Sequence, residues 1–190
     1  MLIVLEGLDG AGKSTQVRLF REYLEGVCPD LEYIHFPRYD APVYGGLIGK
    51  FLRGGFGSIE SVHPQLVALL FAEDRHDAAP QIRARLRAGG TVLLDRYVYS
   101  NIAYQCAKLP SQEEAEDLRE WINNTEYGHF ALPRPDLNIF LDVPIDMYRR
   151  QAALDPHFIC MDCSDDQGRM LPPGDIFAKI KAVYESYPKD

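Results

Sequence analysis

The sequence predicts a three-layer α/β fold in which helices flank a five-stranded parallel sheet, all within a single domain of residues 1–190. Short apolar runs alternate with longer stretches of helical periodicity, and this alternation favours parallel strands joined by helical crossovers. The first apolar run leads directly into a glycine-rich loop. With 46% hydrophobic residues among 190, the chain is long enough to bury a full core.

The predicted strands are compact, β-branched or aromatic runs bounded by glycine, proline or charged residues. They span residues 2–6, 32–36, 91–95, 137–142 and 158–162. The predicted helices span residues 13–24, 43–52, 64–88, 100–109, 112–125, 145–153 and 175–187. No internal repeat or low-complexity tract in the sequence divides the chain further.

Charge and hydropathy restrict the partners of the chain. The formal net charge of -8 at pH 7 argues against a general affinity for nucleic acid, which depends on basic residues that neutralise phosphates. No apolar stretch approaches the ~20 residues that span a bilayer, and Met1 leads straight into a strand-like run without a basic leader. We therefore expect a soluble, cytoplasmic protein that binds neither nucleic acid nor membranes.

The cysteines of the chain are too few for a disulfide scaffold; they are Cys28, Cys106, Cys160 and Cys163. The last two have the spacing of a metal-binding pair, but only His157 stands near them as a further ligand. Because structural zinc takes four ligands, we expect buried structural cysteines instead of a zinc site.

Residues 6–15, EGLDGAGKST, have the spacing of a phosphate-binding loop. Its glycines let backbone N–H groups turn toward phosphate oxygens, and the helix that follows directs the positive end of its dipole at them. Lys13 adds a charge, Ser14 offers a hydroxyl to Mg²⁺, and Asp95 ends a buried strand where a water-mediated metal contact is usual. The pattern predicts a P-loop NTPase fold.

Two classes of nucleotide-binding protein fit the sequence poorly. A GTPase would need an Asn-Lys-x-Asp segment to read guanine, and the sequence contains none. A motor ATPase usually carries a hydrolytic glutamate after its Asp-ended strand, whereas Arg96 follows Asp95 here. A cation beside the magnesium suits a site that holds two sets of phosphates.

Three arginines outside the loop, Arg38, Arg75 and Arg96, stand at or near the ends of apolar segments. Surface arginines are normally just solvated, but Arg38 and Arg96 follow predicted strands, whose carboxyl ends bind ligands in open α/β sheets. Guanidinium groups hold phosphate bidentately, so the three predict a second anion pocket. Two phosphate sites that face each other are typical of a kinase whose acceptor is itself a phosphate.

A set of motifs then carries a family resemblance: GLDGAGKST, FPRY, LLFAEDR, DRYVYSNIAYQ and LPRPDLNIFLDV. In this order and spacing, from Met1 to about Asp142, the chain resembles the thymidylate kinases. These enzymes transfer the γ-phosphoryl group of ATP to dTMP, which gives dTDP and ADP for dTTP synthesis. The resemblance implies an enzyme that uses ATP and Mg²⁺ and forms a homodimer.

The resemblance also implies roles for the residues of the acceptor site. Phe71 would stack on the thymine ring, and Arg75 would bond the carbonyl edge of the base. Arg38 and Arg96 would grip the dTMP phosphate. Phe71 could instead be an ordinary core residue of its helix.

Further roles follow for the sugar side and the phosphate loop. Asn101 and Tyr104 would close the sugar side, with Tyr104 crowding the space of a ribose 2′-OH, and Gln105 would face the base. These three could instead be ordinary polar positions of their helix. Asp9 would engage the 3′-OH and help position the acceptor.

The full predicted site has a donor side and an acceptor side. The ATP-binding residues are Gly7, Leu8, Asp9, Gly10, Ala11, Gly12, Lys13, Ser14 and Thr15, and the metal ligands are Ser14 and Asp95. The dTMP-binding residues are Phe36, Pro37, Arg38, Phe71, Arg75, Arg96, Ser100, Asn101, Tyr104 and Gln105. The catalytic residues are Asp9, Lys13 and Arg96. No general base is expected, because the attacking phosphate oxygen, with a second pKa of about 6, is already largely anionic at pH 7.

Other functions remain open beside this one. The chain could be a kinase for another nucleoside or deoxynucleoside monophosphate, which needs only a changed base pocket. It could also be a non-catalytic nucleotide-binding module. A chromosome-partitioning type of ATPase would leave the second anion site unexplained.

One segment departs from the family pattern. Gly10 stands where some members place a catalytic arginine, so the resemblance implies a mobile lid that brings cations to the ATP phosphates. Here Arg149 and Arg150 run almost at once into the predicted last strand, so the lid and a helix beyond it are missing near residues 149–155. Either the natural chain has no lid, or a mobile stretch is missing from the sequence as read; we favour the second.

The mass of the intact protein separates these two explanations. A missing stretch predicts a mass well above the 21.5 kDa of the 190 residues. A mass near 21.5 kDa would contradict the missing stretch and leave a chain that has no lid.

Overall fold

The computed structural model describes residues 1–8, 12–142, 154–165 and 167–188. The chain forms two compact units. The sheet unit consists of residues 1–33, 85–95 and 135–190, and the helical unit of residues 34–84 and 96–134.

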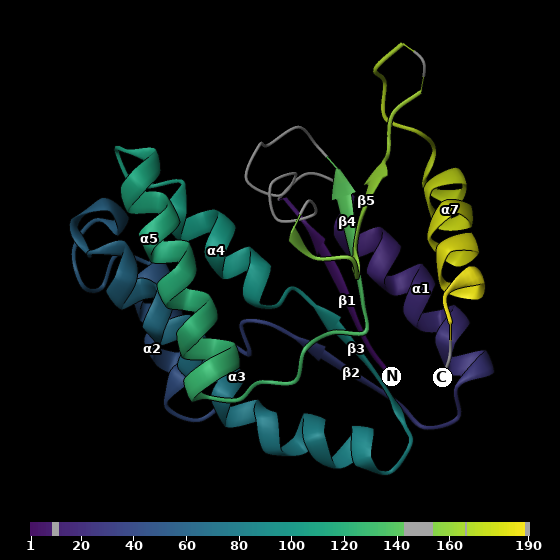
Figure 1. Cartoon of the computed structure of the whole chain (residues 1–190), viewed down its shortest axis with the longest axis horizontal. Helices are drawn as coiled ribbons and strands as arrows, with labels where there is room; N and C mark the ends of the chain where they lie inside the picture. Colours follow the sequence, from purple (N-terminus) through teal and green to yellow (C-terminus); the bar gives the residue numbers. More distant parts are fainter. Residues whose placement is uncertain (9–11, 143–153, 166, 189–190) are drawn as a thin grey trace. The chain divides into compact units, whose positions relative to one another are not determined.

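The sheet contains five strands, and their order in it is β2-β3-β1-β4-β5 (Figure 1). The strands are β1 (Leu2–Gly7), β2 (Leu31–His35), β3 (Thr91–Asp95), β4 (Leu137–Asp142) and β5 (Phe158–Asp162). β1 pairs in parallel with β3 and with β4, and β4 pairs in parallel with β5. The predicted sheet is confirmed, and every predicted strand boundary lies within one residue of the observed one. β1 is buried along its whole length, as expected for an apolar strand at the centre of a parallel sheet.

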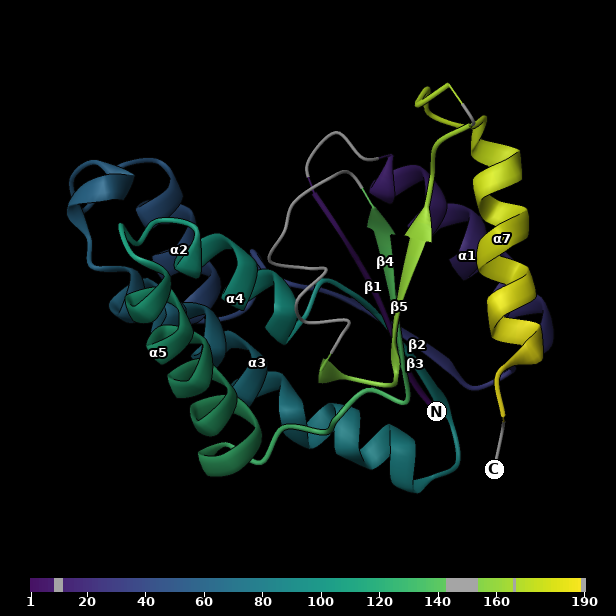
Figure 2. The same cartoon turned by 45° about the horizontal axis from the view of Figure 1, so that its top comes forward.

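Two helices of the sheet unit, α1 (Lys13–Val27) and α7 (Pro173–Ser186), lie side by side against the sheet (Figure 2). Their apolar faces share one core with the strands, and in this core Phe20 meets Tyr184 edge to face at 5.6 Å between ring centroids. α1 begins directly after Gly12, whose φ of 71° is a left-handed conformation that glycine adopts without strain. The start of α1 is therefore set by the phosphate loop.

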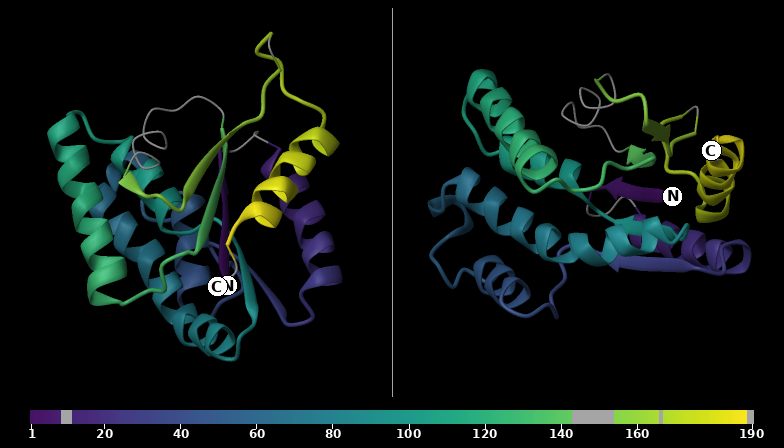
Figure 3. Two further views of the ribbon diagram at one scale, coloured as in Figure 1. Left: turned by 45° about the vertical axis from the view of Figure 1, so that its right-hand side comes forward. Right: turned by 60° about the horizontal axis from the view of Figure 1, so that its bottom comes forward.

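The helical unit contains four of the described α-helices. These are α2 (Tyr44–Leu52), α3 (Pro64–Arg87, whose last three residues belong to the sheet unit), α4 (Val98–Cys106) and α5 (Gln112–Asn123). A short 3₁₀ turn, η1 (Ile59–Ser61), precedes α3, and α4 and α5 pack side by side (Figure 3). The Ser111 hydroxyl caps α5 by accepting a hydrogen bond of 3.2 Å from the Glu114 N–H.

Helix boundaries differ more from the sequence prediction than strand boundaries do. The predicted helix 112–125 ends earlier as α5, and the chain continues as a π-helical turn, η2 (Asn124–His129). The predicted helix 100–109 is displaced toward the N-terminus and becomes α4. The predicted helix 145–153 lies outside the described residues. None of the described helices is long and apolar enough to cross a membrane.

The connection between β4 and β5 is short. These strands are parallel neighbours, and the fifteen residues 143–157 join them. A parallel crossover takes a dozen or more residues, so this connection is close to the minimum length and leaves little chain for an additional lid. Most of the segment, with Arg149 and Arg150, lies outside the described residues.

None of the cysteines forms a disulfide, and they differ in exposure. Cys106 and Cys163 are buried, Cys28 is half-buried and Cys160 is exposed. The expectation of buried cysteines is therefore right for Cys163, which belongs to the core of the sheet unit, and wrong for Cys160. Cys160 occupies an exposed position of β5. Across the residues that the structure describes, no three His, Cys, Asp or Glu side chains gather as a metal site would require.

Candidate active site

The phosphate loop lies between β1 and α1 in the sheet unit. Gly7 ends β1, and a Cβ added to it would lie 3.4 Å from the Leu141 Cβ and 3.5 Å from the Lys13 Cδ. Ser14 and Thr15 are exposed in the first turn of α1, and the Thr15 N–H donates to the Gly12 carbonyl at 3.1 Å. Asp9, Gly10 and Ala11 lie outside the described residues, so their predicted roles stay predictions.

Lys13 and Asp95, which two separate motifs predicted, form an ion pair in the sheet unit. The pairing of β1 with β3 sets Leu5 opposite Asp95, so the end of β3 lies beside the strand that leads into the loop. Both charged side chains are buried. The Tyr33 hydroxyl donates to the second carboxylate oxygen of Asp95 at 3.5 Å. Burial, and then the charge of Asp95, raises the pKa of Tyr33 to about 12.

The donor set at this end of the sheet fits Mg²⁺. Ser14 offers an exposed hydroxyl, and Asp95 offers a carboxylate. Mg²⁺ prefers such oxygen ligands and usually takes only one or two protein groups beside the phosphates and waters. Asp95 already bonds to Lys13 and Tyr33, so a contact through water suits it better than direct ligation.

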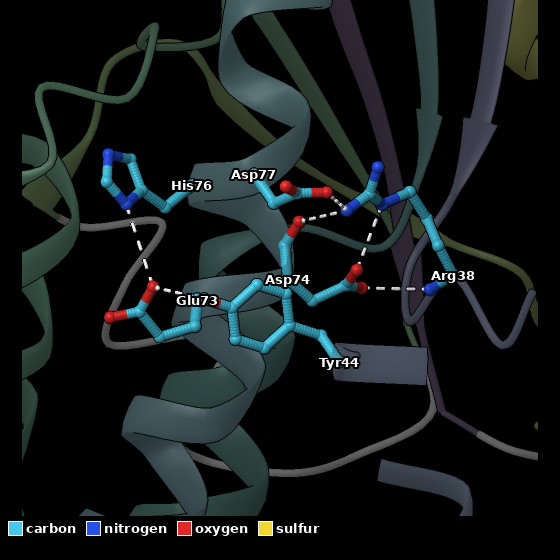
Figure 4. A network of polar contacts seen from close by, with 6 residues as sticks. All are labelled: Arg38, Tyr44, Glu73, Asp74, His76 and Asp77. Atoms are coloured by element: carbon cyan, nitrogen blue, oxygen red, sulfur yellow. Dashed lines mark hydrogen bonds and ion pairs between the residues drawn. The ribbon is translucent and has the colours of Figure 1, made fainter. Parts of the chain in front are cut away.

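Arg38 is held by carboxylates of α3 in the helical unit (Figure 4). Its Nε donates to the Asp74 Oδ1 at 2.9 Å, and its backbone N–H donates to the Oδ2 of the same carboxylate at 2.9 Å. Its Nη2 donates to the Asp74 carbonyl at 2.9 Å and to the Asp77 Oδ2 at 2.6 Å. Asp74 is buried, whereas the side chain of Asp77 is 47% exposed. The guanidinium of Arg38 is thus fixed from one side, while the Arg38 side chain as a whole remains 21% exposed.

The backbone of the Arg38 loop is also fixed. The Arg38 carbonyl accepts from the Ala41 N–H at 2.9 Å. Gly45, in the first turn of α2, passes so close that a Cβ added there would lie 2.5 Å from that carbonyl oxygen. Only glycine can occupy this position without moving the loop. The loop and the helix therefore hold Arg38 in one place together.

Arg75 lies on α3 and forms a buried ion pair with Glu126 of η2. Its Nε donates to the Glu126 Oε2 at 2.5 Å, and its Nη2 donates to the Oε1 at 2.6 Å. Burial alone would lower the pKa of the guanidinium, but the charge and hydrogen bonds of Glu126 outweigh burial and raise this pKa. Arg75 therefore stays charged.

Arg96 forms hydrogen bonds with two other residues of the predicted dTMP site. It adopts a left-handed φ of 68°, a conformation that costs a non-glycine residue energy and that clusters at functional sites. Its Nη1 donates to the Ser100 hydroxyl at 3.4 Å and to the Tyr104 hydroxyl at 3.3 Å. Its guanidinium also lies 5.4 Å from the centroid of the Tyr104 ring. Ser100 and Tyr104 share one face of α4, one turn apart.

The other residues of the predicted dTMP site differ in burial and in their contacts. Phe71 is half-buried on α3, one turn before Arg75, so the two share a helix face. Asn101 is buried and donates to the Ala68 carbonyl and to Glu126. Phe36 is buried against Tyr97, and Pro37 is half-buried. Gln105 is buried and accepts from the Lys108 Nζ at 2.8 Å.

Three carboxylates of this site were not predicted from the sequence. Asp74 and Asp77 flank Arg75 in the segment AEDRHDA, but both bind Arg38. Adjacency in the sequence would therefore have assigned them to the wrong arginine. Glu126 has no such signal, because it lies 51 positions after the arginine that it binds.

The two units thus present two kinds of anion-binding group. The sheet unit offers a glycine loop, a lysine and a helix start, and the helical unit offers three arginines in fixed positions. A model of the family described as "Thymidylate kinase" matches residues 5–158. The chain belongs to the thymidylate kinase family. Members of this family transfer the γ-phosphoryl group of ATP to dTMP and use Mg²⁺ with the ATP.

Individual members of the family support this assignment. The thymidylate kinase of Mycobacterium tuberculosis is 32% identical over 186 residues, which cover 96% of this chain and 86% of that protein. The human thymidylate kinase is 36% identical over 152 residues, which cover 80% of this chain and 65% of that protein. The solved structure of the thymidylate kinase from Candida albicans superposes with a TM-score of 0.75 at 27% identity and covers 97% of this chain and 91% of that one. The family has the P-loop NTPase fold, so the predicted fold class is confirmed.

The first mutational prediction concerns the Lys13–Asp95 pair. Lys13→Ala removes a fixed charge from the phosphate loop, so turnover should fall at least ~100-fold. It also leaves Asp95 buried without its cation, so the free energy of unfolding should fall by about 3–5 kcal/mol. Steady-state kinetics and urea unfolding measure the two effects.

The double variant Lys13→Met with Asp95→Asn is the matched control. It removes both charges, so stability should recover while activity stays low. Near-normal turnover of Lys13→Ala would show that the loop does not hold the transferred phosphate.

A second prediction separates the two carboxylates on Arg38. Arg38→Ala should lower kcat/KM for every monophosphate by an amount equivalent to ~2–4 kcal/mol of transition-state stabilisation. The order of preference among the monophosphates should not change. Asp77→Asn removes an exposed anion that shares the guanidinium, so the KM for dTMP should fall by up to about five-fold. Asp74→Asn should raise that KM, because it releases the buried side of the guanidinium. Equal effects of the two Asp→Asn changes would contradict this division of roles.

Proposed function

We propose that this chain phosphorylates dTMP with ATP through the residues described above. The observation that carries the proposal is the helical unit's set of three arginines, which come from separate segments and are each held by defined partners. These segments are the ones in which the resemblance places the dTMP site. Arg38 and Arg96 would bind the acceptor phosphate, and Arg75 and Phe71 would bind the base.

The proposed reaction needs no base from the protein. An anionic oxygen of the dTMP phosphate forms a new bond to the γ-phosphorus, while the bond from that phosphorus to the β,γ-bridging oxygen breaks. The bridging electron pair stays on ADP. The protein contributes positioning and charge neutralisation, with Lys13 at the donor phosphates and Arg96 at the acceptor. Asp9 would position the sugar, as the resemblance implies.

Mg²⁺ would be bound through Ser14 and, by way of water, through Asp95. When bound with ATP, it supplies further neutralisation of the phosphate charge. The Lys13 ammonium, now paired with Asp95, would then be shared with the phosphates.

We also propose that the chain is a single folding domain that works as a cytoplasmic homodimer. The two compact units alternate along the sequence, with four passages of the chain between them, so no single cut separates them. Apolar side chains are exposed on α2 and at the start of α3, among them Leu47 and Leu66, and exposed apolar surface favours a protein partner. Four cysteines without a disulfide suit a reducing compartment. Sedimentation that shows only monomer at micromolar concentration would contradict the dimer.

A coupled assay for ADP formation tests the proposed activity. With ATP and Mg²⁺, dTMP should be the best acceptor among dTMP, dUMP, dGMP and CMP. A higher kcat/KM for another acceptor would favour the alternative of a different monophosphate kinase. Binding of ATP and dTMP without turnover would favour a non-catalytic module.

The predicted role of Tyr104 generates a test of the sugar side. The residue is 37% exposed, and its hydroxyl accepts a hydrogen bond from Arg96. If the ring crowds the 2′ position, Tyr104→Ala should admit a ribose, and the preference for dTMP over ribo-TMP should fall roughly 10- to 100-fold. Tyr104→Phe keeps the ring and loses only the hydroxyl, so it should keep the sugar preference. An unchanged preference for dTMP over ribo-TMP in Tyr104→Ala would show that Tyr104 does not select the sugar.

A further inference from the structure

Glu73 of α3 lies between two side chains that can each bind its carboxylate (Figure 4). The Tyr44 hydroxyl, from the first residue of α2, donates to the Glu73 Oε2 at 3.3 Å. The Nδ1 of His76, one turn further along α3, lies 3.7 Å from the same oxygen. Figure 4 shows that Tyr44 and His76 approach this oxygen from different sides. A movement of the carboxylate toward His76 therefore lengthens its hydrogen bond to Tyr44.

The contact between Glu73 and His76 depends on the charge of the imidazole. At 3.7 Å it is too long for a hydrogen bond, and a neutral imidazole offers the carboxylate no opposite charge. Histidine side chains ordinarily change charge between about pH 5 and 8, and an imidazolium attracts a carboxylate at this distance. The side chains of His76 and Glu73 are 45% and 32% exposed, so protons reach the ring and the carboxylate has room to move.

Phe130 holds the His76 ring in place. The two rings stack with 4.3 Å between their centroids and 4° between their planes. Because a cation is attracted to the face of an aromatic ring, protonation of His76 strengthens this stack. The ring then stays on Phe130, and the Glu73 side chain moves toward it. This movement breaks the hydrogen bond to Tyr44, which is already long at 3.3 Å.

Tyr44 anchors a strained turn that precedes α2. Its N–H donates to the Pro42 carbonyl at 2.8 Å, and Val43 between them has a φ of 65° and a ψ of -71°. These angles define the rare, strained form of the γ-turn. A β-branched residue keeps such a conformation only where its surroundings enforce it. Val43 is 69% exposed, so its own side chain contributes little, and the bond from Tyr44 to Glu73 is one of the restraints that hold the turn.

The same turn supports the loop of Arg38. Gly45, directly after Tyr44, lies against the Arg38 carbonyl, and its N–H donates to the Ala41 carbonyl at 3.2 Å. Release of Tyr44 would loosen the backbone that presents the Arg38 guanidinium, while Asp74 still holds its Nε. The expected result is a weakened acceptor site and not a lost one.

We propose that His76 is a positioning residue whose protonation withdraws Glu73 from Tyr44 and thereby weakens the binding of dTMP. At higher pH the imidazole is neutral, Glu73 stays with Tyr44, and the acceptor site keeps its full affinity. At lower pH the imidazolium takes the carboxylate, and the affinity falls. The inference rests on the proposed function, in which Arg38 binds the dTMP phosphate.

Other titratable and charged groups surround His76 and its partners. The charge of Glu73, followed by burial, raises the pKa of Tyr44 above its ordinary value, so this hydroxyl remains a donor over the whole range in which histidine titrates. The remaining groups are Asp74 and Asp77 of α3, Arg38 of the loop before α2, and His129 of η2, whose ring centroid lies 5.6 Å from that of Phe130.

The dissociation constant of dTMP, measured by calorimetry at several values between about pH 5.5 and 8, tests the proposal. The dTMP phosphate itself titrates near pH ~6, so each variant is compared with wild-type protein at the same pH. On acidification, wild-type affinity should fall roughly 3- to 10-fold more than that of His76→Gln, which corresponds to the loss of one hydrogen bond. Glu73→Gln still accepts from Tyr44 but does not attract an imidazolium, so it should also lose the extra fall.

Tyr44→Phe separates the hydrogen bond from the charge. It lacks the hydroxyl at every pH, so it should bind dTMP roughly 3- to 10-fold more weakly than wild type near pH ~8 and show no extra fall in acid. His129→Gln is the matched control, because it removes a second exposed imidazole beside the Phe130 ring and should keep the wild-type acid dependence. Loss of that dependence in His129→Gln, or its retention in Tyr44→Phe, would overturn the inference.

An NMR titration of the unaltered protein follows the same event without dTMP. The Cζ signal of Tyr44, assigned by its loss in Tyr44→Phe, should shift with the same midpoint as the imidazole signals of His76. A Tyr44 signal that does not follow His76 would overturn the inference. Equal acid dependence of dTMP binding in wild type and His76→Gln would also overturn it and leave the proposed function intact. Wild-type protein that neither binds nor phosphorylates dTMP would instead refute the proposed function, and the NMR titration would still decide whether His76 controls Tyr44.

Discussion

The pairing of buried cations with carboxylates organises the polar interior of both units. A charged group that leaves water needs an opposite charge and good hydrogen bonds to stay ionised. The buried Lys13 and Arg75 and the half-buried Arg38 each meet this need with a carboxylate that is itself buried: Asp95, Glu126 and Asp74. Each pair joins segments that are far apart in the chain. The cations predicted to bind phosphate therefore also stabilise contacts between distant elements.

The sheet and the phosphate loop could be predicted because their signals are local. A strand such as β1 is a continuous apolar run, and the loop is defined by glycines, a lysine and a serine at fixed spacing. The partners of the cations could not be predicted in the same way. Lys13 and Asp95 are 82 positions apart, and Arg75 and Glu126 are 51 apart. Only the folded backbone shows which carboxylate reaches which cation, so the predicted arginines were identified without the residues that hold them.

Helix ends were harder to predict than strands for a related reason. The segment after α5 has no glycine or proline at the point where the α-helix gives way to η2, and Glu126 in the turn makes tertiary contacts with Arg75 and Asn101. Glu126, which binds Arg75, lies within this π turn. Arg96 gives a second example, since its left-handed φ is set by the passage from β3 to α4 and not by its own preference. Local propensity is overridden at the positions that hold charged groups in place.

The position of β1 has a consequence for the order in which the chain folds. β1 is the first strand in the sequence, but its partners β3 and β4 lie about 90 and 135 residues later. During synthesis, which adds on the order of 5–20 residues per second, the most apolar strand therefore emerges long before either neighbour. Contacts of such high sequence separation slow folding, and unpaired apolar strands promote aggregation meanwhile. Early packing of β1 on α1, or a chaperone, would shield the apolar strand until β3 and β4 have emerged.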